Sequence, residues 1–397
     1  MLANEENFPV IPRGAGTATT GAPLAVNGGL VLYLARLNRI LEINPEDLVA
    51  VVEPGVLNGV FKREVEARGL FYPPDPASYE FSTLGGNVAT CAGGPKGLKY
   101  GVTRDYVLGL EVVLPRGEIV FLGRRTMKGV VGYDLVPLLV GSEGTLGVIT
   151  KLVLKLLPKP QAAATCAAYF EGPEGAGEGF LALIKAGLLP AAAELMDELT
   201  LEATRGFHRR SLPKGARAFL LLEFDGAKAQ VEEDLSLAQE ALKGLSLEVL
   251  VAKDREEREA LWQARRNVSP SLKKIASRKM ADDVVLPRSK VPRFLKNVKE
   301  LSERRGLKVA CFGHLGDGNI HVNLLFEPEE EKEAQRLREE ILSLVLSLSG
   351  TISGEHGVGL TKKGFLPREL PPPVVGLMKE IKRVFDPQDI LNPGKIF

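Results

Sequence analysis

Three glycine-rich segments constrain the fold of this sequence more than any other feature. They are Pro12-Arg13-Gly14-Ala15-Gly16-Thr17, Ser82-Thr83-Leu84-Gly85-Gly86-Asn87 and Gly141-Ser142-Glu143-Gly144-Thr145-Leu146-Gly147. Because glycine has no Cβ, backbone N–H groups in such segments can approach a pyrophosphate closely. None of the segments has the G-x-G-x-x-G spacing of a Rossmann site or the G-x-x-x-x-G-K-S/T spacing of a P-loop. They therefore predict either tight turns in a β-rich domain or a dinucleotide site of another kind.

Length, charge and cysteine usage narrow the class of protein. A chain of 397 residues predicts two or three domains. The net charge of +1 argues against a nucleic-acid partner, and no apolar run approaches the roughly 20 residues that cross a bilayer. No leader pattern opens the sequence, and three widely separated cysteines suit a reducing compartment. We expect a cytoplasmic protein; sparse Asn and Gln beside abundant charged residues favour a thermophilic source.

Changes in composition divide the chain into residues 1–157, 158–340 and 341–397, with Pro158 and Pro160 at the first boundary. Strand-like and helix-like stretches alternate along it, which predicts an α+β fold. The hydrophobic patterns predict strands at 30–34, 49–52, 107–114, 118–122, 148–157, 218–224 and 308–312. They predict helices at 57–68, 231–243, 292–305, 333–347 and 374–385. In the first of these, Leu57, Val60, Phe61 and Val65 form one apolar stripe.

Three of the four histidines lie in two glycine-rich motifs, FGHLGDGNIHVN with His314 and His321 and SGEHGVG with His356. Asp317-Gly318 is a strong signal for a two-residue hairpin turn, which would place His314 directly opposite His321. Opposed residues have Cβ atoms about 4.5–5.5 Å apart, so the two imidazoles could share a metal, with Glu355 as a third ligand. The alternative is an ordinary hairpin, with His314 and His321 as polar loop residues beside it.

His356 directly follows Glu355 and has glycines close by on both sides. Since the imidazole pKa lies near working pH, His356 is a candidate general base for a substrate hydroxyl. The alternatives are a fourth metal ligand or a hydrogen bond to a ligand. Imidazole with one carboxylate favours Zn²⁺, and Mn²⁺, Co²⁺ and Fe²⁺ also suit such a site.

The order of the motifs carries a family resemblance. VIPRGAGT is followed by PPDP at 73–76, STLGGNVAT at 82–90, GLKYG at 97–101 and GSEGTLGVIT at 141–150. This series resembles the FAD domain of the vanillyl-alcohol oxidase superfamily, most closely the glycolate oxidase D-subunit and the FAD-linked D-2-hydroxy-acid (D-lactate) dehydrogenases. The resemblance spans residues 8–397. It implies an FAD-binding domain over 1–157, an α+β, ferredoxin-like cap over 158–340, and a segment over 341–397 that returns to the flavin and completes the flavin and metal site.

The resemblance also implies the site residues. The FAD contacts would be Pro12, Arg13, Gly14, Ala15, Gly16, Thr17, Pro74, Asp75, Ser82, Gly85, Gly86, Asn87, Gly141, Glu143, Gly147, Ile149 and Asn392. The motifs H-x-G-D-G-N-x-H and E-H-G match the family's metal ligands at His314, His321 and Glu355. Arg265 matches the arginine that binds the substrate carboxylate, with Arg266 as a competitor, and Asn323 matches a substrate-contacting asparagine.

Two features depart from the family pattern. Relatives begin with a strand–helix–strand lead-in, whereas this sequence opens at Met1-Leu2-Ala3-Asn4, inside that helix. Either the start codon is placed too late, or the FAD-binding domain is shortened at its N-terminus. A family lysine that contacts longer diacid substrates is replaced by Ala281, with Lys279 nearby, which disfavours 2-hydroxyglutarate.

Together these features predict FAD-dependent oxidation of a small 2-hydroxy acid, glycolate or D-lactate, to the 2-oxo acid at a metal-assisted site. One alternative is a flavin-poor companion subunit of a glycolate oxidase-type electron-transfer complex. Another is a zinc hydrolase, which leaves the glycine-rich segments without a role. The resemblance implies flavin and iron–sulfur partner subunits or a quinone acceptor, a homodimer, and a location that is cytoplasmic or peripheral to the membrane through the partner subunits.

Overall fold

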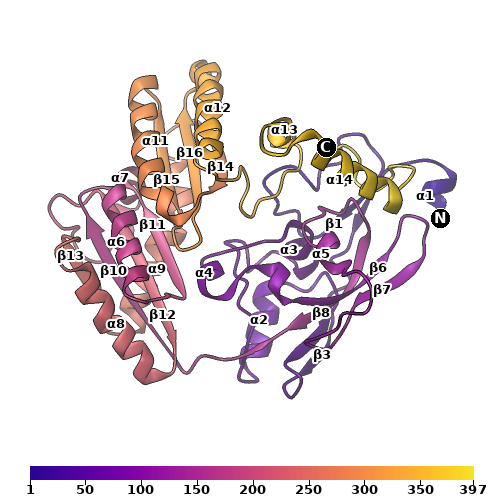
Figure 1. The fold of residues 1–397 in the computed structure, drawn as a ribbon, viewed down its shortest axis with the longest axis horizontal. Helices are drawn as coiled ribbons and strands as arrows, with labels where there is room; N and C mark the ends of the chain where they lie inside the picture. Colours follow the sequence, from indigo (N-terminus) through magenta and orange to yellow (C-terminus); the bar gives the residue numbers. More distant parts are fainter. The chain divides into compact units, whose positions relative to one another are not determined.

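The computed structural model describes residues 1–397, and packing within the chain separates two units (Figure 1). Unit 1 consists of Met1–Gly94, Gly101–Lys159 and Glu355–Phe397. Unit 2 consists of Pro95–Tyr100 and Pro160–Gly354. The chain therefore leaves unit 1 twice, once for six residues and once for the whole of the middle region.

The core of unit 1 lies on a five-stranded antiparallel sheet with the order β3-β4-β8-β6-β7. Its strands are β3 (Ile40–Asn44), β4 (Val49–Val52), β6 (Val107–Val113), β7 (Ile119–Gly123) and β8 (Val148–Lys155). Unit 1 also contains the helices α2 (Asn58–Glu66), α3 (Leu84–Thr90) and α5 (Val136–Leu139). Phe61 and Val65 of α2 are fully buried in this core, whereas Leu57 and Val60, expected on the same stripe, are partly exposed.

Two smaller sheets complete unit 1. Strands β1 (Val10–Arg13) and β2 (Leu30–Tyr33) pair in parallel, and β5 (Leu70–Phe71) pairs with β9 (Leu157–Pro158). The C-terminal segment contains α13 (Leu366–Glu369) and α14 (Pro372–Phe385), and Leu391 forms a parallel bridge with Val10. The N-terminal helix is the short α1 (Leu2–Glu5). The end of the chain thus packs beside the strand that leads into the first glycine-rich segment.

Unit 2 is built on a seven-stranded antiparallel sheet with the order β13-β10-β12-β11-β15-β16-β14. Its first half runs β10 (Ala162–Phe170), α6 (Pro173–Lys185), β11 (Ala192–Met196), β12 (Ala218–Gly226), α8 (Lys228–Leu242), β13 (Glu248–Val251). This βαββαβ sequence, with β10 between β13 and β12, is the ferredoxin-like arrangement predicted for the cap.

The second half of the sheet repeats the pattern without its last strand. It runs β14 (Arg278–Val285), α11 (Val291–Arg305), β15 (Lys308–His314), β16 (Asn319–Phe326), α12 (Glu331–Ser347). The halves join where β11 pairs with β15. The sequence showed no repeat, because the shared feature is the order of elements and not the residues. Local signals still define the elements: α11 has Pro292 in its first turn and is followed by its C-cap Gly306, whose φ is +67°.

Different helices pack on the two faces of the unit 2 sheet. Helices α6, α8, α11 and α12 pack on one face. The other face carries α7 (Glu198–Ala203), α9 (Arg255–Arg266) and α10 (Val268–Leu272) over a core that includes Met196, Phe219 and Phe312. Since alternate residues of a strand share a face, Glu194 and His314 lie on this second face. None of the helices is long and apolar enough to cross a membrane.

Candidate functional site

Unit 1 contains a cavity of about 240 Å³ that the glycine-rich segments surround. Its walls come from the end of β1 and the loop after it, helix α3, the turn before β8, and Glu355 with His356. Twelve of the predicted FAD contacts line it: Pro12, Arg13, Gly14, Ala15, Gly16, Thr17, Gly85, Gly86, Asn87, Glu143, Gly147 and Ile149. Ser78, Thr83, Ser142 and Gly144 line it too, and three of them lie within the glycine-rich segments.

The geometry of these glycines fits a dinucleotide held by backbone. Gly16 and Gly144 have φ values of +74° and +73°, which side chains rarely adopt. A Cβ on Gly14 would lie 2.3 Å from Oγ1 of Thr83, so the first two segments can approach each other only because that position is glycine. Thr83 caps α3 by accepting a hydrogen bond from the N–H of Gly86 at 3.3 Å.

Other predicted FAD contacts lie outside this lining. Pro74, Asp75, Ser82 and Gly141 are not among the residues around the cavity, and neither is Asn392. Asn392 is buried, and its amide donates to the carbonyl oxygens of Ala22 (3.0 Å) and Glu143 (2.7 Å). The structure therefore gives Asn392 a packing role around the cavity, which ties the C-terminal segment to the third glycine-rich segment.

Glu143 holds the loop that carries Glu355 and His356. Its buried carboxylate accepts hydrogen bonds from the N–H groups of Val358 (2.7 Å) and Gly359 (2.9 Å). Burial raises the pKa of Glu143, and the two backbone donors oppose that rise. Nε2 of His356 lies 3.9 Å from Oε1 of Glu355, and its backbone carbonyl accepts from the hydroxyl of Thr20 at 3.1 Å. The predicted base thus lies beside the predicted ligand, at the cavity wall.

In unit 2, His314 and His321 lie together, but the predicted hairpin register is wrong. His314 pairs with Asn319, and His321 pairs with Phe312. The connection is the four residues 315–318, closed by a hydrogen bond from the N–H of Gly318 to the carbonyl of Leu315, so Asp317-Gly318 is only its second half. The histidines are therefore diagonal neighbours, with ring centroids 5.2 Å apart and ligand nitrogens within 4.8 Å.

A buried carboxylate that the sequence analysis missed joins His314 to Arg265. Glu194 of β11 is fully buried, and its Oε1 lies 2.6 Å from Nδ1 of His314. Its Oε2 lies 2.7 Å from Nε of Arg265, an ion pair without the angle of a hydrogen bond. Burial acts to raise the pKa of Glu194, but the contacts with His314 and Arg265 outweigh it and leave the pKa lowered. A lone glutamate in the apolar run 191–196 was the available signal, since a buried charge requires partners.

The remaining predicted residues of unit 2 lie nearby in the sheet. Asn323 is buried in β16, between Ala310 of β15 and Ala281 of β14. Its side-chain amide donates to the carbonyl of His321 at 3.3 Å. Lys279, two residues before Ala281, donates to Oγ of Ser269 at 2.9 Å, and burial lowers its pKa. Arg266, the competitor of Arg265, pairs with Glu259 on the exposed side of α9.

Glu355 is the first residue of the C-terminal part of unit 1, one peptide bond after Gly354. The N–H of Gly354 donates to the carboxylate of Asp283 at 2.8 Å, and Asp283 is the cross-strand partner of His321.

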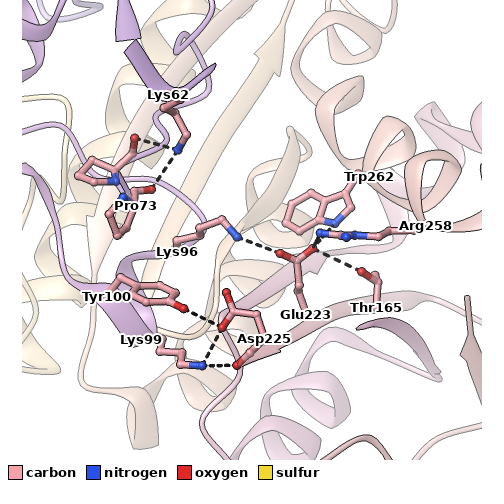
Figure 2. A network of polar contacts seen from close by, with 11 residues as sticks. Lys62, Pro73, Lys96, Lys99, Tyr100, Thr165, Glu223, Asp225, Arg258 and Trp262 are labelled. Atoms are coloured by element: carbon pink, nitrogen blue, oxygen red, sulfur yellow. Dashed lines mark hydrogen bonds and ion pairs between the residues drawn. The ribbon is translucent and has the colours of Figure 1, made fainter. Parts of the chain in front are cut away.

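A second buried glutamate anchors α9 at its other end. Figure 2 shows Glu223 with Lys96, Arg258, Trp262 and Thr165. Its carboxylate accepts from Lys96 (2.9 Å), Arg258 (2.8 Å) and the indole of Trp262 (3.0 Å). Burial acts to raise its pKa, but the charges of Lys96 and Arg258 lower it to about 2. Beside it, Asp225 accepts from Lys99 (2.7 Å) and Tyr100 (2.8 Å), which fixes the segment Pro95–Tyr100 on β12.

Comparison with known families finds two matches along the chain. Residues 1–123 match a family described as FAD binding domain, and residues 159–396 match one described as FAD linked oxidases, C-terminal domain. The chain belongs to the FAD-linked oxidases. The predicted resemblance and the predicted FAD cofactor are confirmed, and the cavity of unit 1 has the glycine-rich walls that such a cofactor needs.

Its curated relatives match over nearly the whole chain. Glycolate oxidase subunit GlcD of Bacillus subtilis (strain 168) is 41% identical over 400 residues, which cover 100% of this chain and 85% of that protein. The corresponding subunit of Escherichia coli (strain K12) is 39% identical over 98% of this chain and 78% of its own length. A D-lactate dehydrogenase of Archaeoglobus fulgidus is 36% identical over 100% and 87%.

Solved structures confirm the predicted α+β fold of the vanillyl-alcohol oxidase type. p-Cresol methylhydroxylase with bound substrate has a TM-score of 0.80 at 18% identity, and the alignment covers 100% of this chain and 85% of that one. An alkyldihydroxyacetonephosphate synthase has a TM-score of 0.76 at 20% identity, with 99% and 74% covered. At these identities the likeness concerns the fold alone.

Proposed function

We propose that this FAD-linked oxidase oxidises a small 2-hydroxy acid, of the glycolate or D-lactate class, to the corresponding 2-oxo acid. The observation that carries the proposal is the group of Glu194, Arg265 and His314 on one face of the unit 2 sheet, which combines a guanidinium for a carboxylate with an imidazole for a metal. The names of the curated relatives support the same substrate class.

In this proposal Arg265 binds the substrate carboxylate through its terminal nitrogens. His356 removes the proton of the 2-hydroxyl group, for which an imidazole is suited at neutral pH. Asn323 contributes a polar contact to the substrate. When bound, FAD would supply the two-electron acceptor for the hydride that leaves C2 of the substrate. The twelve cavity residues named above would hold it, mainly through backbone N–H groups. Ala281 beside Asn323 offers no charge for a second carboxylate, which favours a short substrate.

We also propose that His314, His321 and Glu355 bind a divalent metal, with Zn²⁺ preferred and Mn²⁺, Co²⁺ or Fe²⁺ accepted. The chemistry of the donor set supports this, because a histidine that binds a metal usually donates its other ring N–H to a carboxylate, as His314 does to Glu194. Such a metal supplies Lewis acidity toward the hydroxyl and carboxylate oxygens of the substrate.

The proposed function is tested by turnover of glycolate, D-lactate, L-lactate and D-2-hydroxyglutarate with an artificial electron acceptor. We expect oxidation of glycolate or D-lactate and little oxidation of L-lactate. Comparable rates for L-lactate and D-lactate would contradict the fixed arrangement of Arg265, His356 and the metal. A flavin-poor companion subunit would instead be colourless and inactive, so the visible spectrum of the purified protein separates that alternative.

Electrons must leave the reduced flavin for a further acceptor. We propose flavin and iron–sulfur partner subunits or a quinone for this role, and through such subunits a peripheral association with the membrane. A homodimer is a further proposal. Copurification from native extract, followed by iron analysis, tests the partner subunits.

A further inference from the structure

We propose that Glu194 is the positioning residue of the unit 2 site, which fixes His314 and Arg265 relative to each other through one carboxylate. The inference rests on the proposed function, which assigns His314 to the metal and Arg265 to the substrate. Glu194 itself contacts neither group, so its role is to orient the residues that do.

The position of Glu194 in the sheet makes this role possible. Its strand β11 lies between β12 and β15, where the two halves of the unit 2 sheet join, and Glu194 is the register partner of His314. The side chain is 0% exposed. A buried carboxylate that water cannot reach must have its charge met by the protein, and the partners supplied here are one imidazole and one guanidinium.

The contact with His314 determines which ring nitrogen can bind a metal. Oε1 of Glu194 lies 2.6 Å from Nδ1 of His314. An ionised carboxylate can only accept a hydrogen bond, so Nδ1 carries the proton. Nε2 is then the nitrogen whose lone pair can bind a metal, and the ring cannot rotate without breaking the contact.

The contact with Arg265 places one carboxylate oxygen beside the Nε end of the guanidinium. Oε2 of Glu194 lies 2.7 Å from Nε, and the guanidinium carbon lies 4.9 Å from the centre of the Phe312 ring. The ion pair engages the Nε side of the group. The two terminal nitrogens are therefore the donors that can bind a substrate carboxylate in a two-pronged manner.

One carboxylate thus has one oxygen for each function, so a change at Glu194 must affect metal binding and substrate binding together. Replacing a glutamate with a purely structural role would lower the stability of the protein and leave metal binding and substrate binding unchanged. Glu223 provides that comparison within the same unit, because it is equally buried and ion-paired to α9 but its contacts are Lys96, Arg258, Trp262 and Thr165 (Figure 2).

The test is Glu194→Gln, with Glu223→Gln as the matched control. A glutamine has one acceptor oxygen and one NH₂ group, so it cannot satisfy both partners. We expect the Kd for Zn²⁺, measured by chelator competition on metal-free protein, to rise roughly 10–100-fold. The KM for glycolate or D-lactate should rise by a similar factor at saturating zinc, with kcat less affected. Glu223→Gln should lower the melting temperature and leave both constants unchanged, and flavin absorbance should persist in both variants.

The outcomes separate this inference from the proposed function. If the wild type binds zinc and turns over, but Glu194→Gln has the same Kd and KM, the positioning role is wrong and the proposed function stands. Equal losses of zinc affinity in both variants would also overturn it, since a general loss of packing would then suffice. If the wild type neither binds zinc nor oxidises a 2-hydroxy acid, the proposed function fails, and the role of Glu194 fails with it.

Two further measurements cover a variant that folds poorly. Glu194→Asp keeps the charge but is shorter by one methylene group, so its carboxylate should lie farther from both partners and raise both Kd and KM, by less than Glu194→Gln does. The wild type also gives a direct signature, because a chain with four histidines suits selective ¹⁵N labelling of the rings. Metal-free protein should show His314 as the Nδ1–H tautomer, and an Nε2–H tautomer would contradict the proposal.

Discussion

The two units build their candidate sites by different means. In unit 1 the cavity walls are contiguous segments whose backbone faces the cofactor space, with glycine where a side chain would not fit. In unit 2 the site consists of side chains from separate elements, and Glu194 and His314 are 120 residues apart in sequence. A site built from backbone groups can be recognised as a local sequence motif. A site built from side chains depends on which strands pair and in which register. The same contrast predicts how each unit responds to substitution.

The largest effect is expected for His321→Ala in unit 2. Removing one of the two imidazoles should abolish zinc binding and reduce turnover below detection, because a single imidazole and a carboxylate bind zinc weakly. Flavin absorbance should remain, since the cavity residues belong to unit 1. Metal analysis and the visible spectrum of one preparation measure both. Simultaneous loss of flavin would show that the two sites do not act separately.

A smaller effect is expected for His356→Ala, which lies at the wall of the unit 1 cavity. As the general base it should lower kcat on the order of 10²–10⁴-fold with little change in zinc content. Steady-state kinetics and metal analysis provide the measurement. A marked fall in zinc occupancy would instead make His356 a metal ligand.

The third prediction concerns the pH dependence of unit 2. The pKa of Glu223 is lowered to about 2, so its stabilising contribution is present above pH 4.5 and is lost as pH falls toward 2. That contribution is roughly 3 kcal/mol. Glu223→Gln should remove it and flatten the acid side of the stability curve, as denaturant unfolding at several pH values would measure. A variant with the same acid dependence as the wild type would show that other carboxylates are responsible.

The smallest effect is expected for Gly14→Ala in unit 1. The added Cβ would meet Thr83 and force apart two segments of the cavity wall, at a cost of about 1–3 kcal/mol. Less flavin should copurify, and the absorbance ratio of flavin to protein measures it. Gly376→Ala is the control, because a Cβ there meets nothing within 4 Å. Equal flavin content in the two variants would argue against a tightly packed backbone site.

What could be predicted from the sequence follows the same contrast. The glycine-rich segments and most strands and helices were predictable, because turns, caps and hydrophobic periodicity are local signals. The proximity of His314 and His321 was predicted from Asp317-Gly318. The predicted register was shifted by two residues, because the turn has four residues and not two. A diagonal pair on the same face remains close enough to share a ligand, so the wrong register did not change the prediction that the two histidines lie together.

The role of Glu194 could not be predicted, since it depends on which strand neighbours β11. No local pattern indicates that β15 pairs with it, because that pairing joins two halves of a sheet separated by more than 100 residues. The exposure of Val60 also escaped prediction: helical spacing identifies a stripe but not its width. The identity of the metal and of the FAD contacts stays a prediction.

The repeated order of elements in unit 2 has a consequence for its chemistry. Glu194 belongs to the first βαββαβ half, while His314 and His321 belong to the second, and they meet only where β11 pairs with β15. Neither half alone carries the cluster. The contact between Glu194 and His314 therefore requires both halves, paired along this one edge. A cut of the chain between the halves would leave the carboxylate and the two imidazoles in separate fragments.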